Sequence, residues 1–293
     1  MVMKMKIYMY PNLVKPNSRK YTEQACAVLI SEGAQICMEE EYREIFGELY
    51  EIEYLSQIEC VEKCDVIVVT GGDGTILRCS SVASKYGKPI LGINCGTLGF
   101  MASLEFTEIE KLRLLCRGEY TVTDRMMLSV KVKCENGEEL SADALNDAVI
   151  IKGEDCKITD FEVSKSGSVI SSLRADGVIF STATGATAYS LSAGGPIIEP
   201  DMQCIEFSQI CAHSLFARTI VFSPSSHISV HCHNRGGGHA ILTVDGTQLA
   251  KLSDRDIVVI ERSQLTTQII DITGGSFFPT VNRKLMTPLK ETM

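Results

Sequence analysis

The segment spanning residues 66–78 restricts the fold of this chain more than any other. It starts with an apolar, mostly β-branched run ending at Thr70, passes through Gly71-Gly72-Asp73-Gly74, and has helical apolar spacing from Ile76 onward. Such a run predicts a buried strand of a parallel sheet, followed by a helix. Glycines let a ligand approach the main-chain N–H groups, and the N–H groups at a helix start suit phosphate. Because a carboxylate repels phosphate unless it binds Mg²⁺ or accepts a proton from an attacking hydroxyl, Asp73 indicates phosphoryl transfer.

Composition limits the class of protein. The chain has 293 residues, enough for one large or two ordinary domains, and its 45% apolar and 22% charged residues are typical of a globular protein. A net charge of −9 argues against a nucleic-acid partner. No apolar run approaches the roughly 18 residues of a membrane span, and no signal-peptide core precedes Pro11, so we expect a cytoplasmic protein without a membrane partner. The 12 cysteines form no CxxC pair and are expected to be reduced.

Two domains are predicted from the change in hydrophobic pattern near residue 124. Before it, strand and helix patterns alternate, which indicates an α/β domain with a parallel sheet over residues 1–124. Thr107 and Glu110 have the spacing of a capping box for one of its helices. After it, short alternating segments predict a β-rich domain over residues 125–272. We expect the tail, residues 273–293, to pack back on the first domain.

Three further segments carry residues suited to a ligand site. A second glycine-bearing turn, residues 92–100, follows the next predicted strand, and α/β ligands gather at such strand ends. Asn146 and Asp147 interrupt an apolar strand with groups that can accept hydrogen bonds from a ribose. Residues 174–196 combine small, hydroxyl and glycine residues with Tyr189, which leaves room for a flat ligand.

Several common motifs are excluded. The first glycine turn lacks the spacing of a Walker A loop and the third glycine of a dinucleotide fingerprint. The cluster His231, His233 and His239 invites a zinc interpretation, but residues 234–238 are typical of a surface turn. We assign no metal ligand among these histidines, and the sequence leaves open whether they bind a metal ion.

Together these segments resemble the NAD kinase family, of the bacterial type. Residues 71–75 look like its GGDG motif, residues 94–100 like its NxGxLGF segment, and residues 212–215 like its PHSL segment. Residues 174–196 are similar to its nucleotide-binding stretch, and residues 242–246 and 276–285 extend the likeness almost to the C-terminus. The markers occur in the order in which the family has them.

The resemblance implies a function and a site. It implies transfer of the terminal phosphate of ATP or polyphosphate, with Mg²⁺ or another divalent cation, to the adenosine 2′-hydroxyl of NAD, producing NADP. It further implies a homodimer or homotetramer, and a two-domain architecture related to diacylglycerol kinases. Asp73 matches the proposed general base. The positions matching the family's substrate-binding residues are Gly74, Arg78, Phe100, Asn146, Asp147, Lys157, Arg174, Asp176, Thr184, Thr187, Ala188, Tyr189, Ser190, Leu191 and Ser192.

Two departures and two alternatives accompany this assignment. Asp147 stands where the family usually has Glu, which shortens the reach of the carboxylate, and Thr247 stands where Gln often follows Asp245-Gly246. A lipid or small-alcohol kinase would share the GGDG turn, and a non-catalytic NAD(H) sensor would share the pocket. The sequence leaves open the choice between NAD and NADH, between ATP and polyphosphate, and feedback by NADP.

Overall fold

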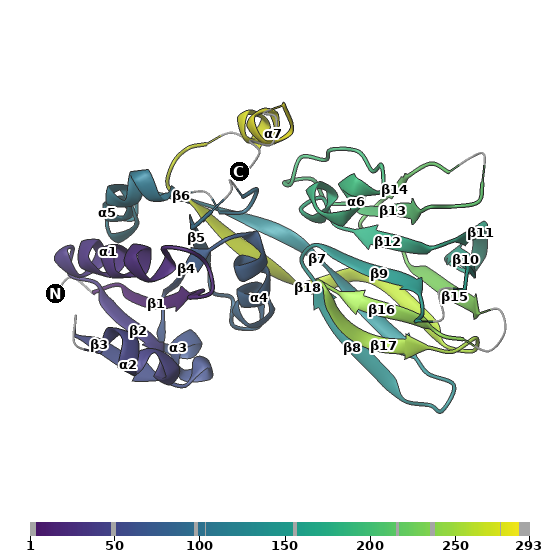
Figure 1. Ribbon diagram of the computed structural model, residues 1–293, viewed down its shortest axis with the longest axis horizontal. Coiled ribbons are helices and arrows are strands. Elements are labelled where there is room, and N and C mark those ends of the chain that lie inside the picture. The colour runs from purple at the N-terminus through teal and green to yellow at the C-terminus, as the bar shows by residue number, and fades with distance from the viewer. Residues whose placement is uncertain are drawn as a thin grey trace. The chain divides into compact units, whose positions relative to one another are not determined.

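The computed structural model describes residues 4–47, 51–96, 99–102, 104–154, 157–214, 217–234, 238–275 and 277–286. The chain divides into two compact units, which we call unit 1 (residues 1–124 with 267–293) and unit 2 (residues 125–266) (Figure 1). Within the described ranges, no helix combines the length and the apolar character needed to cross a membrane.

Unit 1 alternates strands and helices along the chain. Its elements are β1 (Lys6–Pro11), α1 (Ser18–Ser31), β2 (Gln35–Glu39), η1 (Glu40–Tyr42), α2 (Arg43–Phe46), β3 (Ile52–Leu55), α3 (Gln57–Lys63), β4 (Val66–Gly71), α4 (Asp73–Ala83), η2 (Ser84–Tyr86), β5 (Ile90–Asn94), β6 (Leu104–Glu105), η3 (Phe106–Lys111), α5 (Leu112–Cys116) and α7 (Phe277–Met286). The long strands β7 (Thr121–Lys133) and β18 (Ile257–Asp271) each contribute one end to this unit.

The sheet of unit 1 has the order β3-β2-β1-β4-β5, and the pairings between these neighbours are parallel. The end of β18 adds to β5 through Ile269, which pairs with Ile90. The predicted α/β domain with a parallel sheet is thus confirmed. The strand order reverses direction between β1 and β4, and in such sheets ligands bind outside the carboxyl ends of the strands at this point.

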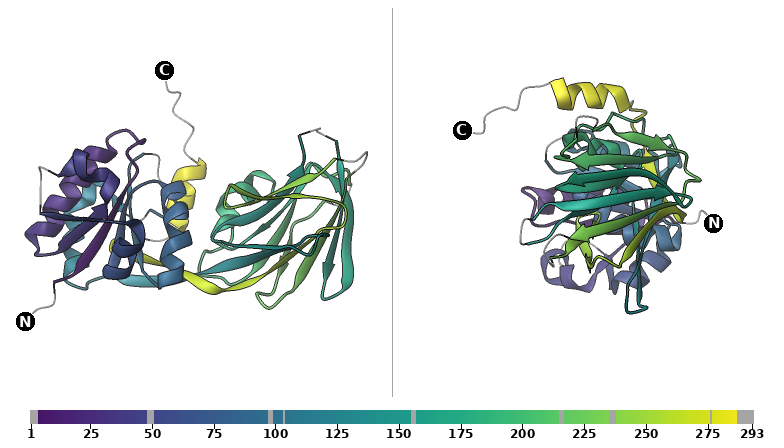
Figure 2. Two further views of the ribbon diagram at one scale, coloured as in Figure 1. Left: turned by 90° about the horizontal axis from the view of Figure 1, so that it is seen from below. Right: turned by 90° about the vertical axis from the view of Figure 1, so that its right-hand side faces the viewer.

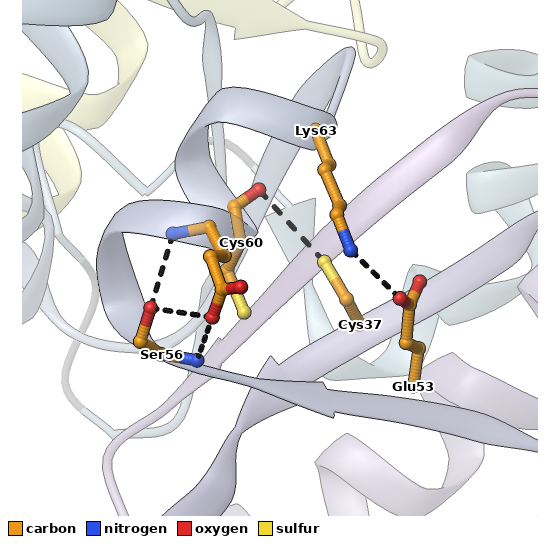
Figure 3. Close-up of polar contacts among 6 residues, drawn as sticks. Cys37, Glu53, Ser56, Cys60 and Lys63 are labelled. Atoms are coloured by element: carbon orange, nitrogen blue, oxygen red, sulfur yellow. Dashed lines mark hydrogen bonds and ion pairs between the residues drawn. The ribbon is translucent and has the colours of Figure 1, made fainter.

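Side chains alternate between the two faces of the sheet along each strand. Both faces therefore present apolar side chains, and helices pack against each of them. Ile36 and Met38 belong to the core that α1 and α5 complete, together with Leu29. Between them on β2, Cys37 turns to the other face and donates a hydrogen bond from Sγ to the Cys60 carbonyl of α3 at 3.9 Å (Figure 3).

One expected helix start is wrong, and an unexpected one is present. Residues 106–111 form the 3₁₀ helix η3, and its capping residue Glu105 makes no side-chain cap. The Glu110 carboxylate accepts from Arg113 Nε at 2.9 Å. A complete capping box forms at α3 (Figure 3).

Unit 2 consists almost entirely of strands. Its elements, besides the shared β7 and β18, are β8 (Glu139–Ala144), β9 (Asp147–Lys152), β10 (Thr159–Lys165), β11 (Ser168–Ala175), β12 (Gly177–Ser181), η4 (Gly185–Thr187), α6 (Tyr189–Ser192), β13 (Ile205–Ile210), β14 (Ile220–Phe222), β15 (Ile228–Asn234), β16 (Ala240–Val244) and β17 (Thr247–Leu252). The β-rich second domain is confirmed.

The strands of unit 2 form two layers (Figure 2). One layer is an antiparallel sheet of order β14-β13-β12-β9-β16-β17. The other has the order β11-β10-β15-β18, with β7 and β8 paired to each other and β7 to β18. Apolar side chains fill the space between the layers, where the rings of Phe180 and Phe207 stack at 5.1 Å. The motif residues Thr97, Leu98, Leu215 and Ser276, and the tail from residue 287, lie outside the described residues.

Candidate functional site

The first glycine turn lies at the reversal point of the unit 1 sheet. Strand β4 ends at Gly71, Gly72 has an extended backbone, and α4 begins at Asp73. The turns after β1, β4 and β5 line a cavity of about 310 Å³. Because the first N–H groups of a helix lack partners within it, the start of α4 supplies donors and a partial positive charge to this cavity.

The carboxylate of Asp73 joins the two glycine turns. Its Oδ2 accepts from the N–H of Phe100 at 2.7 Å, and its Oδ1 accepts from Met101 at 3.0 Å and Ala102 at 3.3 Å. The second turn approaches so closely that a Cβ at Gly99 would overlap Asp73 Oδ1. The side chain is therefore held at one position in the cavity by groups from a segment more than twenty residues away.

Cationic and amide groups complete the cavity. Lys15 and Arg78 both line it, next to Asn12, whose Nδ2 donates to Thr75 Oγ1 at 2.8 Å. Arg78 was expected from the family likeness, whereas Lys15 and Asn12 were not identified. Both residues follow β1. The sequence could indicate them as site residues only if β1 were known to neighbour β4, because the carboxyl ends of adjacent parallel strands meet at one edge of the sheet.

In unit 2, Asn146 lies in the tight connection between β8 and β9, and Asp147 is the first residue of β9. The carboxylate of Asp245 accepts from the N–H groups of Leu145 at 2.8 Å, Asn146 at 2.8 Å and Asp147 at 3.1 Å. From the other side, Thr182 Oγ1 donates to the Leu145 carbonyl at 2.6 Å. Asn146 Oδ1 is buried and has no hydrogen-bond partner among the described residues. An orphaned buried acceptor of this kind is costly unless a ligand satisfies it.

The carboxyl groups of Asp147 and Asp245 lie close enough for the charge of Asp245 to affect Asp147. Burial, together with the charge of Asp245, raises the pKa of Asp147 to about 7. Burial also raises the pKa of Asp245, and the three main-chain N–H donors oppose this rise by stabilising its charged form. Asp245 closes the turn between β16 and β17 with a positive φ of 48°, followed by Gly246 at 78°. Its role as the holder of residues 145–147 was not recognised from the sequence.

The expected residues from 184 to 192 form two short turns after β12. Thr184 is buried before η4, while Tyr189 of α6 is 43% exposed and Ser192 is also exposed. Thr187, Ala188 and Leu191 are partly exposed. Ser190 differs from its neighbours, because its hydroxyl is fully buried and donates to Glu206.

Lys157, Arg174 and Asp176 lie at the other end of the strands. Asp147 pairs with Ser181 at one end of β9 and β12, and Ile151 pairs with Gly177 near the other end. The length of these two strands therefore separates Asn146 from Asp176. At about 3.3 Å per residue, Asp176 lies roughly 16 Å along the strand from the end that carries Asn146. There, Asp176 forms an ion pair with Lys152 at 2.7 Å. Within one copy of the chain, the structure therefore does not bring Lys157, Arg174 and Asp176 together with Asn146.

No three His, Cys, Asp or Glu side chains of the described ranges are arranged to hold a metal ion. His231 and His233 lie on β15, a strand paired on both sides. The carboxylate of Asp73 is the one acidic group that lines the glycine-turn cavity within the part of the chain described.

Comparison with known proteins identifies the family. The family model described as ATP-NAD kinase N-terminal domain matches residues 7–120, and the one described as ATP-NAD kinase C-terminal domain matches residues 145–272. A protein named NAD kinase from Caldanaerobacter subterraneus is 34% identical over 281 residues, covering 96% of this chain and 98% of that protein. One from Citrifermentans bemidjiense is 32% identical over 282 residues, covering 96% and 98%.

Solved structures share the fold. Yeast NADH kinase complexed with NADH matches with a TM-score of 0.88 and 24% identity, over 98% of this chain and 89% of that one. An NAD kinase from Archaeoglobus fulgidus in complex with ATP matches with a TM-score of 0.69 and 24% identity, over 97% of both chains. From the two family models and the full-length relatives, it follows that the chain belongs to the NAD kinase family, whose members are kinases that phosphorylate NAD.

Proposed function

We propose that this chain transfers the terminal phosphoryl group of ATP, or of polyphosphate, to the 2′-hydroxyl of the adenosine ribose of NAD, with Asp73 as general base. The observation that carries the proposal is the Asp73 carboxylate, held by three main-chain N–H groups in a cavity that also contains Lys15 and Arg78. A fixed proton acceptor beside cationic groups is the arrangement that phosphoryl transfer to a hydroxyl requires.

The chemical role of Asp73 follows from its lone pairs. A carboxylate offers about four acceptor positions, so it can accept from a hydroxyl as well as from main-chain N–H groups. As the ribose oxygen bonds to phosphorus, its proton passes to Asp73. The bond from phosphorus to the bridging oxygen then breaks, and ADP or a shortened polyphosphate leaves with that electron pair.

The cavity fits a nucleotide that brings its own metal ion. Mg²⁺ is commonly held by one or two carboxylates together with substrate phosphates and water. Asp73 and the amide of Asn94 are oxygen-bearing groups of the cavity lining that suit such an ion. When bound, Mg²⁺ would neutralise charge on the transferring group. Lys15, Arg78 and the first N–H groups of α4 would contact the phosphates themselves.

NAD binding is assigned to the connection around Asn146. Its buried, unpartnered Oδ1 would accept from the adenine amino group, and the Asp147 carboxylate would accept from ribose hydroxyls. Tyr189 is exposed on α6, which follows β12, the strand paired with β9, and its ring could cover a ring of the ligand. Phe100 is assigned to the adenine by family likeness.

We further propose a homodimer or homotetramer in which Lys157, Arg174 and Asp176 serve the pocket of a second copy. Support comes from their position at the far end of β9 and β12 from Asn146. In a symmetric dimer, side chains at opposite ends of a strand can be brought to one pocket across the interface between the two copies.

The test is production of NADP by the purified chain. The protein is incubated with NAD, MgCl₂ and either ATP or polyphosphate, and NADP is measured with an NADP-specific dehydrogenase. We expect NADP with at least one donor. A lipid or small-alcohol kinase would consume ATP only with other acceptors, and an NAD(H) sensor would bind NAD without forming NADP.

A further inference from the structure

Glu206 is a fully buried carboxylate that is surrounded by hydroxyl groups. Its Oε1 accepts from Ser190 Oγ and from Ser208 Oγ, the latter at 2.9 Å. Its Oε2 accepts from Ser181 Oγ at 3.0 Å. Burying a carboxylate is expensive unless its oxygens are hydrogen-bonded, so this set of donors offsets a large desolvation cost.

The hydroxyl groups come from separate segments around the turn that contains η4 and α6. Ser181 is the last residue of β12 and pairs directly with Glu206 across the sheet. Ser208 lies two residues further along β13, on the same face, and hydrogen-bonds Thr219 at 2.8 Å. Ser190 belongs to α6, and its Oγ lies 3.0 Å from Ser208 Oγ while its single proton is donated to Glu206. One carboxylate thus connects the end of β12, α6 and the approach to β14.

Helix α6 depends on this contact for its position. It has four residues and no side-chain cap, and a single isolated turn is unstable in water. Ser190 is its one buried residue, so the hydroxyl facing Glu206 is the main attachment of α6 to the sheet beneath. The following turn packs on the same group, since a Cβ at Gly195 would overlap Glu206 Oε1.

We propose that Glu206 is a positioning residue for NAD binding, which acts by holding α6 through Ser190. The inference rests on the proposed function, because α6 carries Tyr189 and Ser192, which we assign to the NAD pocket. Without the carboxylate, the hydroxyls of Ser181, Ser190 and Ser208 lose their common acceptor, and the turn is free to shift. A shifted turn weakens NAD binding while the glycine-turn cavity in unit 1 is unchanged.

The experiment compares Glu206→Ala, Glu206→Gln and Ser190→Ala with wild type. NAD affinity is measured by isothermal titration calorimetry, and KM and kcat are measured separately for NAD and ATP. We expect Glu206→Ala to raise the Kd and KM for NAD about tenfold, the effect of losing one or two hydrogen bonds. The kcat and the KM for ATP should stay within about threefold. Glu206→Gln keeps one acceptor oxygen, and serine hydroxyls can rotate to accept from its amide, so it should restore most of the affinity.

Asp256→Asn is the matched structural control. Asp256 is a buried carboxylate of the same unit and accepts from Glu135 N at 2.8 Å and Ser253 N at 2.7 Å, on segments other than α6. Its amide variant should lower the melting temperature without changing the Kd for NAD. If Glu206→Ala behaves in the same way, the positioning role is wrong.

Two outcomes separate this inference from the proposed function. Wild type that binds NAD but forms no NADP overturns the kinase proposal, while the calorimetric comparison still tests Glu206. If Glu206→Ala does not fold, Ser190→Ala decides, because it removes one hydroxyl and leaves the carboxylate with Ser181 and Ser208. An unchanged Kd for NAD in a folded Ser190→Ala variant would overturn the inference.

Discussion

The carboxylate of Asp245 accepts a hydrogen bond from the main-chain N–H of Asp147 at 3.1 Å, which brings the half-buried Asp245 next to the buried Asp147 beside Asn146. Burial and this neighbouring charge raise the pKa of Asp147 to about 7. A group assigned to ribose hydroxyls therefore changes its charge near neutral pH.

NAD affinity should depend on pH through Asp147. Above about pH 7 the carboxylate is charged and accepts from ribose hydroxyls, whereas below it the protonated group is a poorer acceptor. We expect KM for NAD to rise as the pH falls from 8 to 6. Initial rates at varied NAD measure this, and Asp147→Asn should remove the dependence. An identical profile in that variant would assign the titration to another group.

Stability should depend on pH in the opposite sense. The pKa of Asp147 rises from the ordinary aspartate value of 3.8, which applies to the unfolded chain, to about 7 in the folded protein. The folded state therefore holds the proton more tightly. The stabilisation is complete below about pH 4 and is lost as the pH rises through 7. The pKa values differ by about three, so the total is of the order of 4 kcal/mol.

Asp147→Asn should therefore be more stable than wild type at pH 8, with a smaller difference at pH 5. Urea unfolding at both pH values measures the free energy of unfolding. Glu154→Gln is the control, because that carboxylate is 74% exposed and its loss should change stability by less than about 1 kcal/mol. Equal stability of Asp147→Asn and wild type at pH 8 contradicts the prediction.

Asp73→Asn should lower kcat at least ~100-fold, the low end of general-base contributions. The amide also turns a donor toward the main-chain N–H groups of residues 100–102, so the free energy of unfolding should fall by about 1–3 kcal/mol. Steady-state rates and urea unfolding of the same variant measure both effects. Near-normal turnover would remove Asp73 from the role of base.

Gly99→Ala tests the same carboxylate without changing its chemistry. The new Cβ would overlap Asp73 Oδ1 and displace it or the second turn. We expect kcat to fall with the Kd for NAD less affected. Gly118→Ala is the control. A Cβ at Gly118, after the end of α5, would meet no atom within 4 Å, so the cost in stability comes only from the positive φ of 74°.

Lys15→Gln and Arg78→Gln should raise KM for ATP more than KM for NAD. Both side chains line the cavity at the start of α4, where phosphates are assigned. Losing a cation at such a site should cost roughly tenfold in affinity. Lys20→Gln, an exposed residue on α1, is the charge-matched control. If KM for NAD rises instead, the phosphates lie elsewhere.

Co-expression tests whether Asp176 serves a second copy. Asp147→Ala and Asp176→Ala are each expected to be nearly inactive. If the pocket is shared in a dimer, mixed dimers contain one intact site, so co-expression should recover about a quarter of wild-type activity. Full activity of Asp176→Ala alone, or no recovery on co-expression, contradicts the shared pocket.

The sequence alone determined the local elements of the first site and the family. The apolar run before Gly71 and the helical spacing after it predict β4 and α4 correctly, because a buried strand and an amphipathic helix are encoded in neighbouring residues. Hydrophobic alternation likewise predicts the β-rich unit. The NAD kinase family follows from motifs that each lie within a short segment.

Only the tertiary structure decided which distant groups meet. Lys15 reaches the Asp73 cavity because β1 neighbours β4, and Asp245 holds Asn146 because β16 neighbours β9. Glu206 and Ser208 alternate with apolar residues, a pattern typical of a solvent face, yet α6 covers them. Spacing along a strand specifies which side chains share a face, but strand order and covering segments depend on long-range packing.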